Sequence, residues 1–302
     1  MLLRVALMRV GYTFCMSSLI QIRKPKGQGG DFAVKEAVLF ARLAELPSLL
    51  IAVSGGADSA YLAWAANEVL GERALSVTAI SASFSAYDRE ELEKLVAHTK
   101  IRHEFVETHE FENPAYRANA GDRCYYCKDE LFNVLDEMAR QRGFAAIAYG
   151  VNADDTSDFR PGHRAAKEHE VLAPLLDAGI SKAEIRALSE RAGLPTWDRP
   201  ASACLSSRLP YGTEVTPERL ALVEKGEAAL RELGFRQFRV RLHDQLARIE
   251  IAPEELPRAM TPELGATIAE RFKAAGFLYV ALDLEGYRQG SLNAALKAKT
   301  GR

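Results

Sequence analysis

The sequence has little that would suit a membrane protein or a nucleic-acid-binding protein. Its longest apolar runs, such as SLLIAV at 48–53, are far shorter than the roughly 20 residues of a membrane-spanning helix. Lysine and arginine (39 residues) nearly balance aspartate and glutamate (41 residues), and the net charge of −2 predicts no basic surface for nucleic acid. We therefore expect neither a membrane nor a nucleic acid as a partner.

Cysteine is also scarce, with four residues in a chain of 302. Cys15 lies in an apolar N-terminal stretch that Arg4 and Arg9 interrupt, a pattern unlike a secretion signal. We expect residues 1–32 to be an extension outside the folded core. The three remaining cysteines are an odd number, which argues against a disulfide framework and favours a cytoplasmic protein.

Strand-like and helix-like segments alternate over the first two thirds of the chain. This alternation predicts an α/β fold with a doubly wound parallel sheet over residues 33–198. The expected strands are 48–53, 74–81, 103–108 and 145–150, and the expected helices are 33–46, 58–71, 88–100, 128–143 and 183–193.

A proline-rich, aperiodic stretch at 194–217 marks a domain boundary, and we assign 199–215 as a cysteine-bearing interdomain loop. Residues 216–302 follow as a smaller C-terminal α+β domain. It should contain a helix opening at Thr216-Pro217, the strands FRVRLH and LARIEI, a helix at 261–275 and a final strand.

A glycine-rich turn, SGGADS at 54–59, follows the first buried strand and leads directly into a helix. Glycines let the backbone approach a ligand, and the unpaired amides of a helix start attract anions. The turn lacks the Gly-Lys-Ser/Thr of a Walker A loop, so we expect no lysine to reach the terminal phosphates. Because Asp58 would repel a phosphate unless Mg²⁺ bridged the two, the turn predicts a site for metal-bound pyrophosphate. For SGG alone, a plain strand–turn–helix with a serine cap is an equal alternative.

The cysteines of the folded part form a pair and a distant single residue. Cys204 has small neighbours and is flanked by Arg199 and Arg208, which would favour its reactive thiolate form; an inert buried cysteine is the alternative. Cys124 and Cys127 are spaced for a metal site, a redox pair or a disulfide, and their spacing alone does not distinguish these. A redox pair usually opens a helix directly after a strand, whereas this pair follows the loop ENPAYRANAGDR at 112–123.

The strand followed by SGGADS resembles the signature of the PP-loop ATP pyrophosphatases, which cleave ATP between its α- and β-phosphates and adenylate a substrate. Five further segments extend the resemblance from about residue 33 to the C-terminus: RCYYCK (123–128), YGVNADDTSDFRPG (149–162), RPASACLSSRLPYG (199–212), VRLHDQLARIEI (240–251) and LDLEGYRQGSLN (282–293). Together they resemble the LarE family of ATP-dependent sulfur transferases, which build the nickel-pincer nucleotide cofactor of lactate racemase.

The resemblance implies a reaction in which ATP adenylates a carboxylate of pyridinium-3,5-biscarboxylate mononucleotide. The Cys204 thiolate would then displace AMP, and the product would be a thiocarboxylate. Cys124, Cys127 and Cys204 are similar to the three-cysteine branch of the family, in which three cysteines hold a [4Fe-4S] cluster. Zinc and a redox pair stay open as alternatives. The resemblance also implies a homo-oligomer.

The expected site residues fall into three sets. The catalytic residues are Cys204 and Asp58. ATP and Mg²⁺ should be bound by Ser54, Gly55, Gly56, Asp58, Ser59, Gly150, Asn152 and Arg160. The substrate mononucleotide should be bound by Ser207, Arg208, Glu227, Arg239 and Arg241.

Arg239 and Arg241 alternate on one expected strand, so they should face the same side and could bind a phosphate through their guanidinium groups. The alternative is a solvated edge strand. For Glu227 the alternative is likewise a solvated position on a helix.

Three other functions remain possible from the sequence. Two are further adenylating reactions, tRNA thiolation and amide ligation. The third is a non-catalytic module that senses nucleotide or holds an iron–sulfur cluster.

Overall fold

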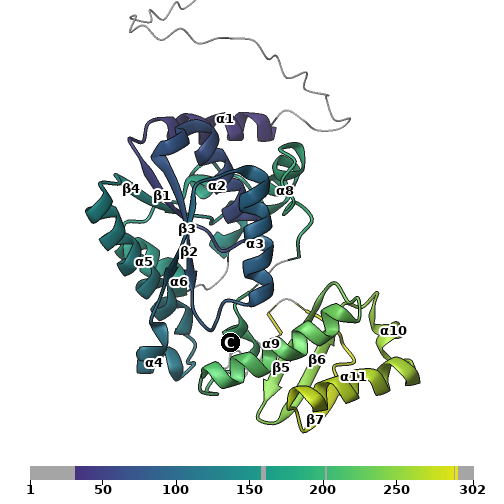
Figure 1. Cartoon of the computed structure of the whole chain (residues 1–302). Helices are drawn as coiled ribbons and strands as arrows, with labels where there is room; N and C mark the ends of the chain where they lie inside the picture. Colours follow the sequence, from purple (N-terminus) through teal and green to yellow (C-terminus); the bar gives the residue numbers. More distant parts are fainter. Residues whose placement is uncertain (1–30, 158–160, 201–202, 289, 292–302) are drawn as a thin grey trace, which may run out of the picture.

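The computed structural model describes residues 31–157, 161–200, 203–288 and 290–291, and this part of the chain contains two β-sheets (Figure 1). The strands are β1 Leu49–Ala52, β2 Ala74–Ile80, β3 His103–Glu107, β4 Ala146–Tyr149, β5 Phe238–His243, β6 Leu246–Ile251 and β7 Tyr279–Leu282. The helices are α1 Asp31–Ala44, α2 Ala57–Leu70, α3 Ala86–Thr99, α4 Pro114–Arg117, α5 Arg123–Arg142, α6 Pro161–Glu168, α7 Pro174–Asp177, α8 Lys182–Arg191, α9 Pro217–Glu232, α10 Leu256–Ala259 and α11 Pro262–Ala275.

The first sheet has the strand order β3-β2-β1-β4, and each pair of neighbouring strands is parallel. Helices α1, α2, α3 and α8 lie on one side of this sheet, and α5 and α6 lie on the other (Figure 1). Parallel neighbours need crossover connections, and these helices supply them. The predicted α/β fold with a doubly wound parallel sheet is confirmed.

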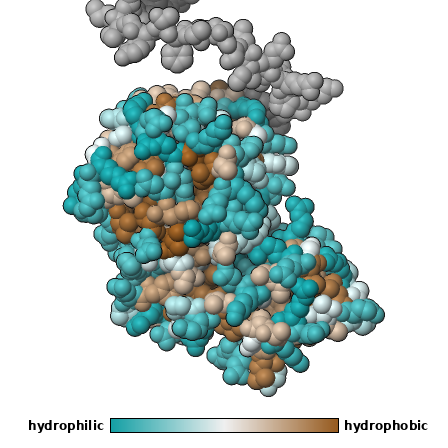
Figure 2. All heavy atoms as spheres, viewed as in Figure 1, coloured by the Kyte–Doolittle hydropathy of each residue, from teal (hydrophilic) through white to brown (hydrophobic). Residues whose placement is uncertain are grey.

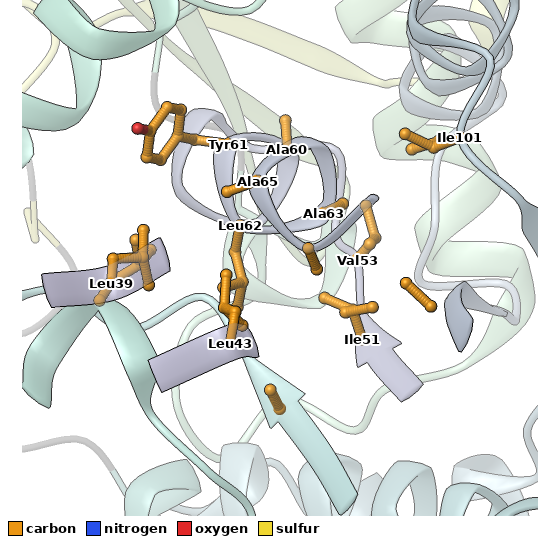
Figure 3. Packing of buried hydrophobic residues seen from close by; sticks show 14 of the residues in the cluster. Leu39, Leu43, Ile51, Val53, Ala60, Tyr61, Leu62, Ala63, Ala65 and Ile101 are labelled. Carbon is orange, nitrogen blue, oxygen red and sulfur yellow. The ribbon is translucent and has the colours of Figure 1, made fainter. Parts of the chain in front are cut away.

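Alternate residues of β1 belong to opposite cores. Ile51 packs with Leu39 and Leu43 of α1 on the side that α2 covers (Figure 3). Leu50 packs on the other side with Phe132 of α5. Because both faces are covered, every residue of β1 is buried, which explains its uninterrupted apolar sequence.

The second sheet has the order β5-β6-β7, with β5 antiparallel and β7 parallel to β6. Its apolar face, which includes Val240 and Ile249, packs in one core with Leu220 and Val223 of α9 and with Phe272 of α11. Helix α9 begins where the sequence predicted, because Pro217 occupies its first turn and the Thr216 hydroxyl accepts a hydrogen bond from the Arg219 amide. The smaller α+β unit is therefore confirmed.

The core of the second half also contains residues from outside 216–302. Tyr116 of α4 is buried in it, and so are Leu205 and Leu209 of the cysteine-bearing loop. The loop is thus anchored at both ends of its short 3₁₀ turn, Leu205–Arg208. The boundaries at 198/199 and 215/216 stay predictions.

Helix α5 begins at Arg123, five residues before the predicted start at 128, so Cys124 and Cys127 lie in its first turns. The predicted helix start at 128 was therefore wrong. Tyr126 and Cys127 pack against the core of the second half, and this tertiary contact extends the helix beyond its local sequence signal. The pair still does not follow a strand directly, because α4 lies between β3 and α5.

Helix α1 begins at Asp31, two residues before the predicted helix start at 33, and Phe32 packs against the first core. Residues 1–30, including Cys15, lie outside the described residues. Figure 2 shows hydrophilic side chains over most of the visible face, with apolar ones gathered in patches between them. Within the described residues, no helix combines the length and the apolar character needed to cross a lipid bilayer.

Candidate active site

The glycine-rich turn between β1 and α2 has the backbone expected of an anion site. Gly55 has a φ of 75°, a left-handed conformation that favours glycine. The Ser59 hydroxyl folds back, accepting a hydrogen bond from the Ser54 amide (3.1 Å) and donating one to the Gly56 carbonyl (3.2 Å). The first amides of a helix lack intrahelical acceptors, and Gly56 offers no side chain to cap them. These donors are therefore available to a phosphate.

Asp58 in this turn forms an ion pair with Lys182, the first residue of α8. The lysine Nζ lies 2.7 Å from both carboxylate oxygens. Asn152 also donates to the Asp58 carboxylate, at 3.3 Å. A lysine from 124 residues downstream thus reaches this loop, and it does not belong to a Walker A sequence. The only local signal for it was its position at the start of a helix. That no lysine reaches the terminal phosphates stays a prediction.

The loop after β4 meets the glycine-rich turn closely. A Cβ added to Gly150 would lie 2.6 Å from the Ser59 nitrogen, so only glycine allows this approach. Asn152 is buried, and its side-chain oxygen accepts a hydrogen bond from the Asp154 amide (2.9 Å). This loop, at the carboxyl end of a parallel strand, therefore places Asn152 beside Asp58, and its part in binding ATP stays a prediction.

Several aspartates lie close together in the sequence of this loop, and backbone amides as well as a cation can compensate their negative charges. Asp155 accepts a hydrogen bond from the Asn152 amide (3.1 Å), and Asp154 accepts one from the Lys182 amide (2.8 Å). The predicted ATP ligand Arg160 and the neighbouring Asp158 lie outside the described residues.

Cys204 is exposed at the start of the 3₁₀ turn, and contacts to the next residues fix its position. The Ser206 hydroxyl lies 2.7 Å from the hydroxyl of the buried Tyr116, and the Ser206 carbonyl accepts a hydrogen bond from Arg123 (2.8 Å). The Leu205 amide donates to the Ser83 carbonyl in the loop after β2 (3.0 Å). The cysteine loop is therefore bound to α4, α5 and the first sheet at once.

These contacts bring the three thiols of the described residues into one region. Cys124, Cys127 and Cys204 are all free. Although Cys124 is exposed, the protein packed around its thiol raises the pKa, and so does the charge of Cys204. For Cys127, burial is the main cause of a strongly raised pKa, followed by the charge of Cys204. Although Cys127 and Cys204 are 77 residues apart in sequence, the charge of one thiol thus affects the pKa of the other.

Two buried guanidinium groups lie beside these thiols, that of Arg123 and that of the predicted Arg208, since the charge of Cys204 acts to raise the pKa of both. The Arg123 charge lowers the pKa of Cys124 against the effect of burial, and the Arg123 cation is in turn stabilised by Cys204. The signal was present in the sequence, because Arg123 directly precedes the cysteine pair in GDRCYYC.

The two predicted arginines bind other groups. Arg199 donates to the Gly55 carbonyl of the glycine-rich turn (2.8 Å) and to the Asp88 carboxylate (2.6 Å). Arg208 is buried and forms two parallel hydrogen bonds with Glu227, at 2.7 and 3.0 Å. The first arginine therefore connects the cysteine loop to the glycine-rich turn, and the second holds that loop against α9.

Glu227 is buried rather than solvated. Burial alone would raise its pKa, but the charge and the hydrogen bonds of Arg208 outweigh this, and the pKa lies below its usual value. Arg208 also donates to the Ser207 hydroxyl (3.0 Å) and to the Cys204 carbonyl (3.0 Å). In this arrangement, the pair of Arg208 and Glu227 stabilises the conformation of the cysteine loop.

Arg239 and Arg241 lie on the same face of β5, as predicted from their alternation. Arg241 is buried and donates to Glu250 (2.8 Å) and to the Ser207 carbonyl (3.0 Å). Burial and the positive charge of Arg208 both lower the pKa of Arg239, so an anion at this position would relieve an unfavourable cluster of cations.

Comparison with known proteins gives a consistent set of relatives. The chain is 34% identical over 267 residues to pyridinium-3,5-bisthiocarboxylic acid mononucleotide synthase of Lactiplantibacillus plantarum, which covers 87% of this chain and 95% of the relative. It is 46% identical over 252 residues to an uncharacterised protein of Synechocystis, covering 83% and 94%. An uncharacterised protein of Methanocaldococcus jannaschii is 31% identical over 170 residues, covering 56% and 66%. No family model matches the chain.

Proposed function

Because the chain belongs to the LarE family, that of pyridinium-3,5-bisthiocarboxylic acid mononucleotide synthase, we propose that it is an ATP-dependent sulfur transferase. Its substrate is pyridinium-3,5-biscarboxylate mononucleotide, and its product carries a thiocarboxylate for the nickel-pincer nucleotide cofactor. The observation that supports this most directly is the Arg199 contact with the Gly55 carbonyl, which connects the segment before Cys204 to the anion site (2.8 Å).

In the first step, a substrate carboxylate oxygen attacks the α-phosphorus of ATP. The bond from that phosphorus to the bridging oxygen breaks, and pyrophosphate leaves. The amides at the start of α2 bind the departing pyrophosphate, and Lys182 adds a positive charge beside it. A bound Mg²⁺ would neutralise further phosphate charge. Asp58 is its expected ligand, sharing its carboxylate with Lys182.

In the second step, the Cys204 thiolate attacks the carbonyl carbon of the adenylate. A carbon–sulfur bond forms, the carbon–oxygen bond to AMP breaks, and AMP leaves with the electron pair. The Arg123 guanidinium stabilises negative charge at the thiols. If Cys204 gives up its own sulfur, loss of its Cα proton with cleavage of the Cβ–S bond leaves the thiocarboxylate and a dehydroalanine.

The three thiols fit a [4Fe-4S] cluster in kind and number, since all are free and their charges act on one another. Within the described residues, no three histidine, cysteine, aspartate or glutamate side chains are grouped closely enough for a single metal ion. A cubane would place each thiolate on a different iron, and zinc stays the alternative. A cluster on Cys124, Cys127 and Cys204 would supply sulfide as the sulfur donor and preserve Cys204. A homo-oligomer stays a prediction from the family.

The proposed function is tested by incubating the anaerobically purified protein with ATP, sulfide and pyridinium-3,5-biscarboxylate mononucleotide. We expect AMP and pyrophosphate to form, and the mononucleotide to gain the mass that replaces oxygen by sulfur. Release of AMP without any sulfur in the product would contradict the proposal. Protein mass spectrometry then identifies the donor, because loss of H₂S from Cys204 indicates that this cysteine was consumed.

A further inference from the structure

A cavity of about 290 Å³ lies between the start of α3, the cysteine loop and the face formed by α9 and β5. Its lining is rich in arginine. The arginines of this cavity are Arg199, Arg208, Arg231, Arg236 and Arg239. Such a concentration of cations beside the cysteine loop is the lining expected of a site for a ligand with several negative charges.

Three of these arginines are already paired with carboxylates. Arg199 binds Asp88 at 2.6 Å, Arg208 binds Glu227 at 2.7 Å, and Arg236 lies 3.5 Å from Asp198. These pairs largely neutralise one another. Arg239 has polar partners of its own, including the Phe238 carbonyl at 2.6 Å.

Arg231, in the last turn of α9, differs from the others. Its guanidinium carbon lies 3.7 Å from the centre of the Tyr87 ring and 5.6 Å from that of Phe238. Within the described part of the chain, no hydrogen bond or ion pair engages this guanidinium. This contact with the ring leaves the N–H groups of the guanidinium available to bind a carboxylate through two parallel hydrogen bonds.

The stack also fixes the arginine before a ligand arrives. Arg231 is half-buried against an aromatic ring from the other half of the molecule, so its side chain has already lost much of its rotamer freedom. Binding of an anion then costs less conformational entropy than at a mobile surface arginine. The positive charge of Arg239 on the same cavity favours an anion further.

We propose that Arg231, held by Tyr87, binds the substrate carboxylate that is not being activated. This inference rests on the proposed function, whose substrate carries one phosphate and two carboxylates. While one carboxylate is adenylated, the other needs a cationic partner in the same cavity. When the second carboxylate reacts, the first has become a thiocarboxylate, which is still an anion with two acceptor atoms. Once the pyridinium ring has rotated so that its two carboxyl positions exchange places, the same guanidinium binds the group that is not reacting in the second reaction as well.

The test compares two ligands by calorimetry on the purified protein. Pyridinium-3,5-biscarboxylate mononucleotide has both carboxylates, whereas nicotinamide mononucleotide keeps the ring, ribose and phosphate and has none. Arg231→Met should weaken binding of the dicarboxylate by about 10- to 100-fold, the effect of one charge-assisted pair, and should leave nicotinamide mononucleotide within about twofold. Tyr87→Phe should preserve the stack and bind both ligands like the parent.

Arg271→Met is the matched control, because it removes a positive charge from an exposed pair with Glu232 (2.8 Å) that lies outside this cavity. We expect it to change neither affinity by more than about twofold, as befits a solvent-screened charge. Thermal unfolding of each variant separates a loss of binding from a loss of fold.

The outcomes distinguish the inference from the function on which it rests. If the parent binds the dicarboxylate and Arg231→Met binds it equally well, the carboxylate subsite is wrong and the proposed function stands. If Arg231→Met weakens both ligands equally, Arg231 binds the phosphate or only packs, and the inference is again overturned. If the parent binds neither mononucleotide, both proposals are wrong.

Discussion

Asp58 and Lys182, 124 residues apart in the chain, form an ion pair in which the lysine Nζ lies 2.7 Å from both carboxylate oxygens. The pair connects the glycine-rich turn after β1 to the start of α8. It compensates the negative charge that would otherwise oppose a phosphate in this turn, and it places a cation where pyrophosphate is expected to leave.

Lys182→Met should reduce ATP cleavage by about 100- to 1,000-fold, the cost of removing one preorganised group that stabilises developing charge. Asp58→Asn should act in the same direction because it removes the partner of Lys182 and the expected ligand of Mg²⁺. Pyrophosphate release measures both effects. Lys35→Met is the control. Lys35 of α1 forms an ion pair at 2.9 Å with Glu184, which lies on the same helix as Lys182, and it does not contact Asp58. Pyrophosphate release at the parent rate in both Lys182→Met and Asp58→Asn would contradict the proposed role of the glycine-rich turn.

Cys204→Ala should eliminate thiocarboxylate formation while still allowing ATP to adenylate the substrate, because activation precedes attack by the thiolate. The measurement is the ratio of pyrophosphate to sulfur-containing product in a single turnover. A variant that loses both activities while its unfolding midpoint is unchanged would assign Cys204 to the ATP step instead.

Anaerobically purified protein should be brown and contain about four irons per chain if Cys124, Cys127 and Cys204 hold one cubane. Replacing any one of the three with alanine should sharply reduce the iron content, because two thiolates anchor a cubane poorly. Cys15→Ala should retain the parent iron content and serves as the control. Zinc in place of iron, with no visible absorbance, would remove the cluster from the proposal.

Glu227→Gln should destabilise the protein by about 3–5 kcal/mol, because it leaves the buried Arg208 cation without its counter-charge. Glu93→Gln removes a carboxylate from an exposed pair with Arg89 and should cost at most about 1 kcal/mol. Urea unfolding at neutral pH measures both. Equal effects of the two substitutions would mean that the Arg208–Glu227 contact contributes no more than a surface pair.

His169 should stabilise the protein more strongly at acidic than at alkaline pH. Its ring nitrogens lie 2.6 Å from Asp136 and 3.0 Å from Asp129, and these carboxylates outweigh burial and raise the pKa of His169 above its usual value. The stabilisation is complete below the unfolded pKa of about 6.5 and is lost as the pH rises through the higher folded pKa. His169→Gln should therefore cost more stability at about pH 6 than at about pH 9.

The contribution of His103 to stability should have the opposite pH dependence. Burial lowers its pKa to about 4, so its contribution is complete above the unfolded pKa and is lost as the pH falls toward the folded value. His103→Gln should flatten the decline in stability below about pH 6.5 and leave the alkaline side unchanged. If both variants shift stability in the same direction with pH, the two assignments cannot both be correct.

The glycine-rich turn was predictable because its whole signal is local. Gly55 and the start of α2 follow a buried strand within a few residues, and the alternation of strands and helices then fixes where this turn lies on the sheet. Asn152 was predictable for the same reason, since the carboxyl ends of neighbouring parallel strands meet at one edge.

The side-chain partners were not predictable, because they join residues that no periodicity relates. Lys182 reaches Asp58 from 124 residues downstream, and Arg208 pairs with Glu227 in addition to facing the charge of the Cys204 thiol that it flanks in sequence. A charged residue next to a cysteine in the chain can point either way, and only the packing of Tyr116 and Leu205 in a shared core decides it. Long-range burial, rather than propensity, determines these contacts.

The hydrogen bond from Arg123 to the Ser206 carbonyl spans 83 residues, so it can form only some time after Arg123 has been synthesised. A ribosome adds about 5–20 residues per second, so the cysteine pair of α5 waits on the order of ten seconds before its third member exists. The first sheet is complete by then, while the thiol region still lacks the loop and the core that bind Cys204. Until then this region contains only the thiols of Cys124 and Cys127, and the contacts that place Cys204 beside them are complete only when the core around Phe272 has been synthesised.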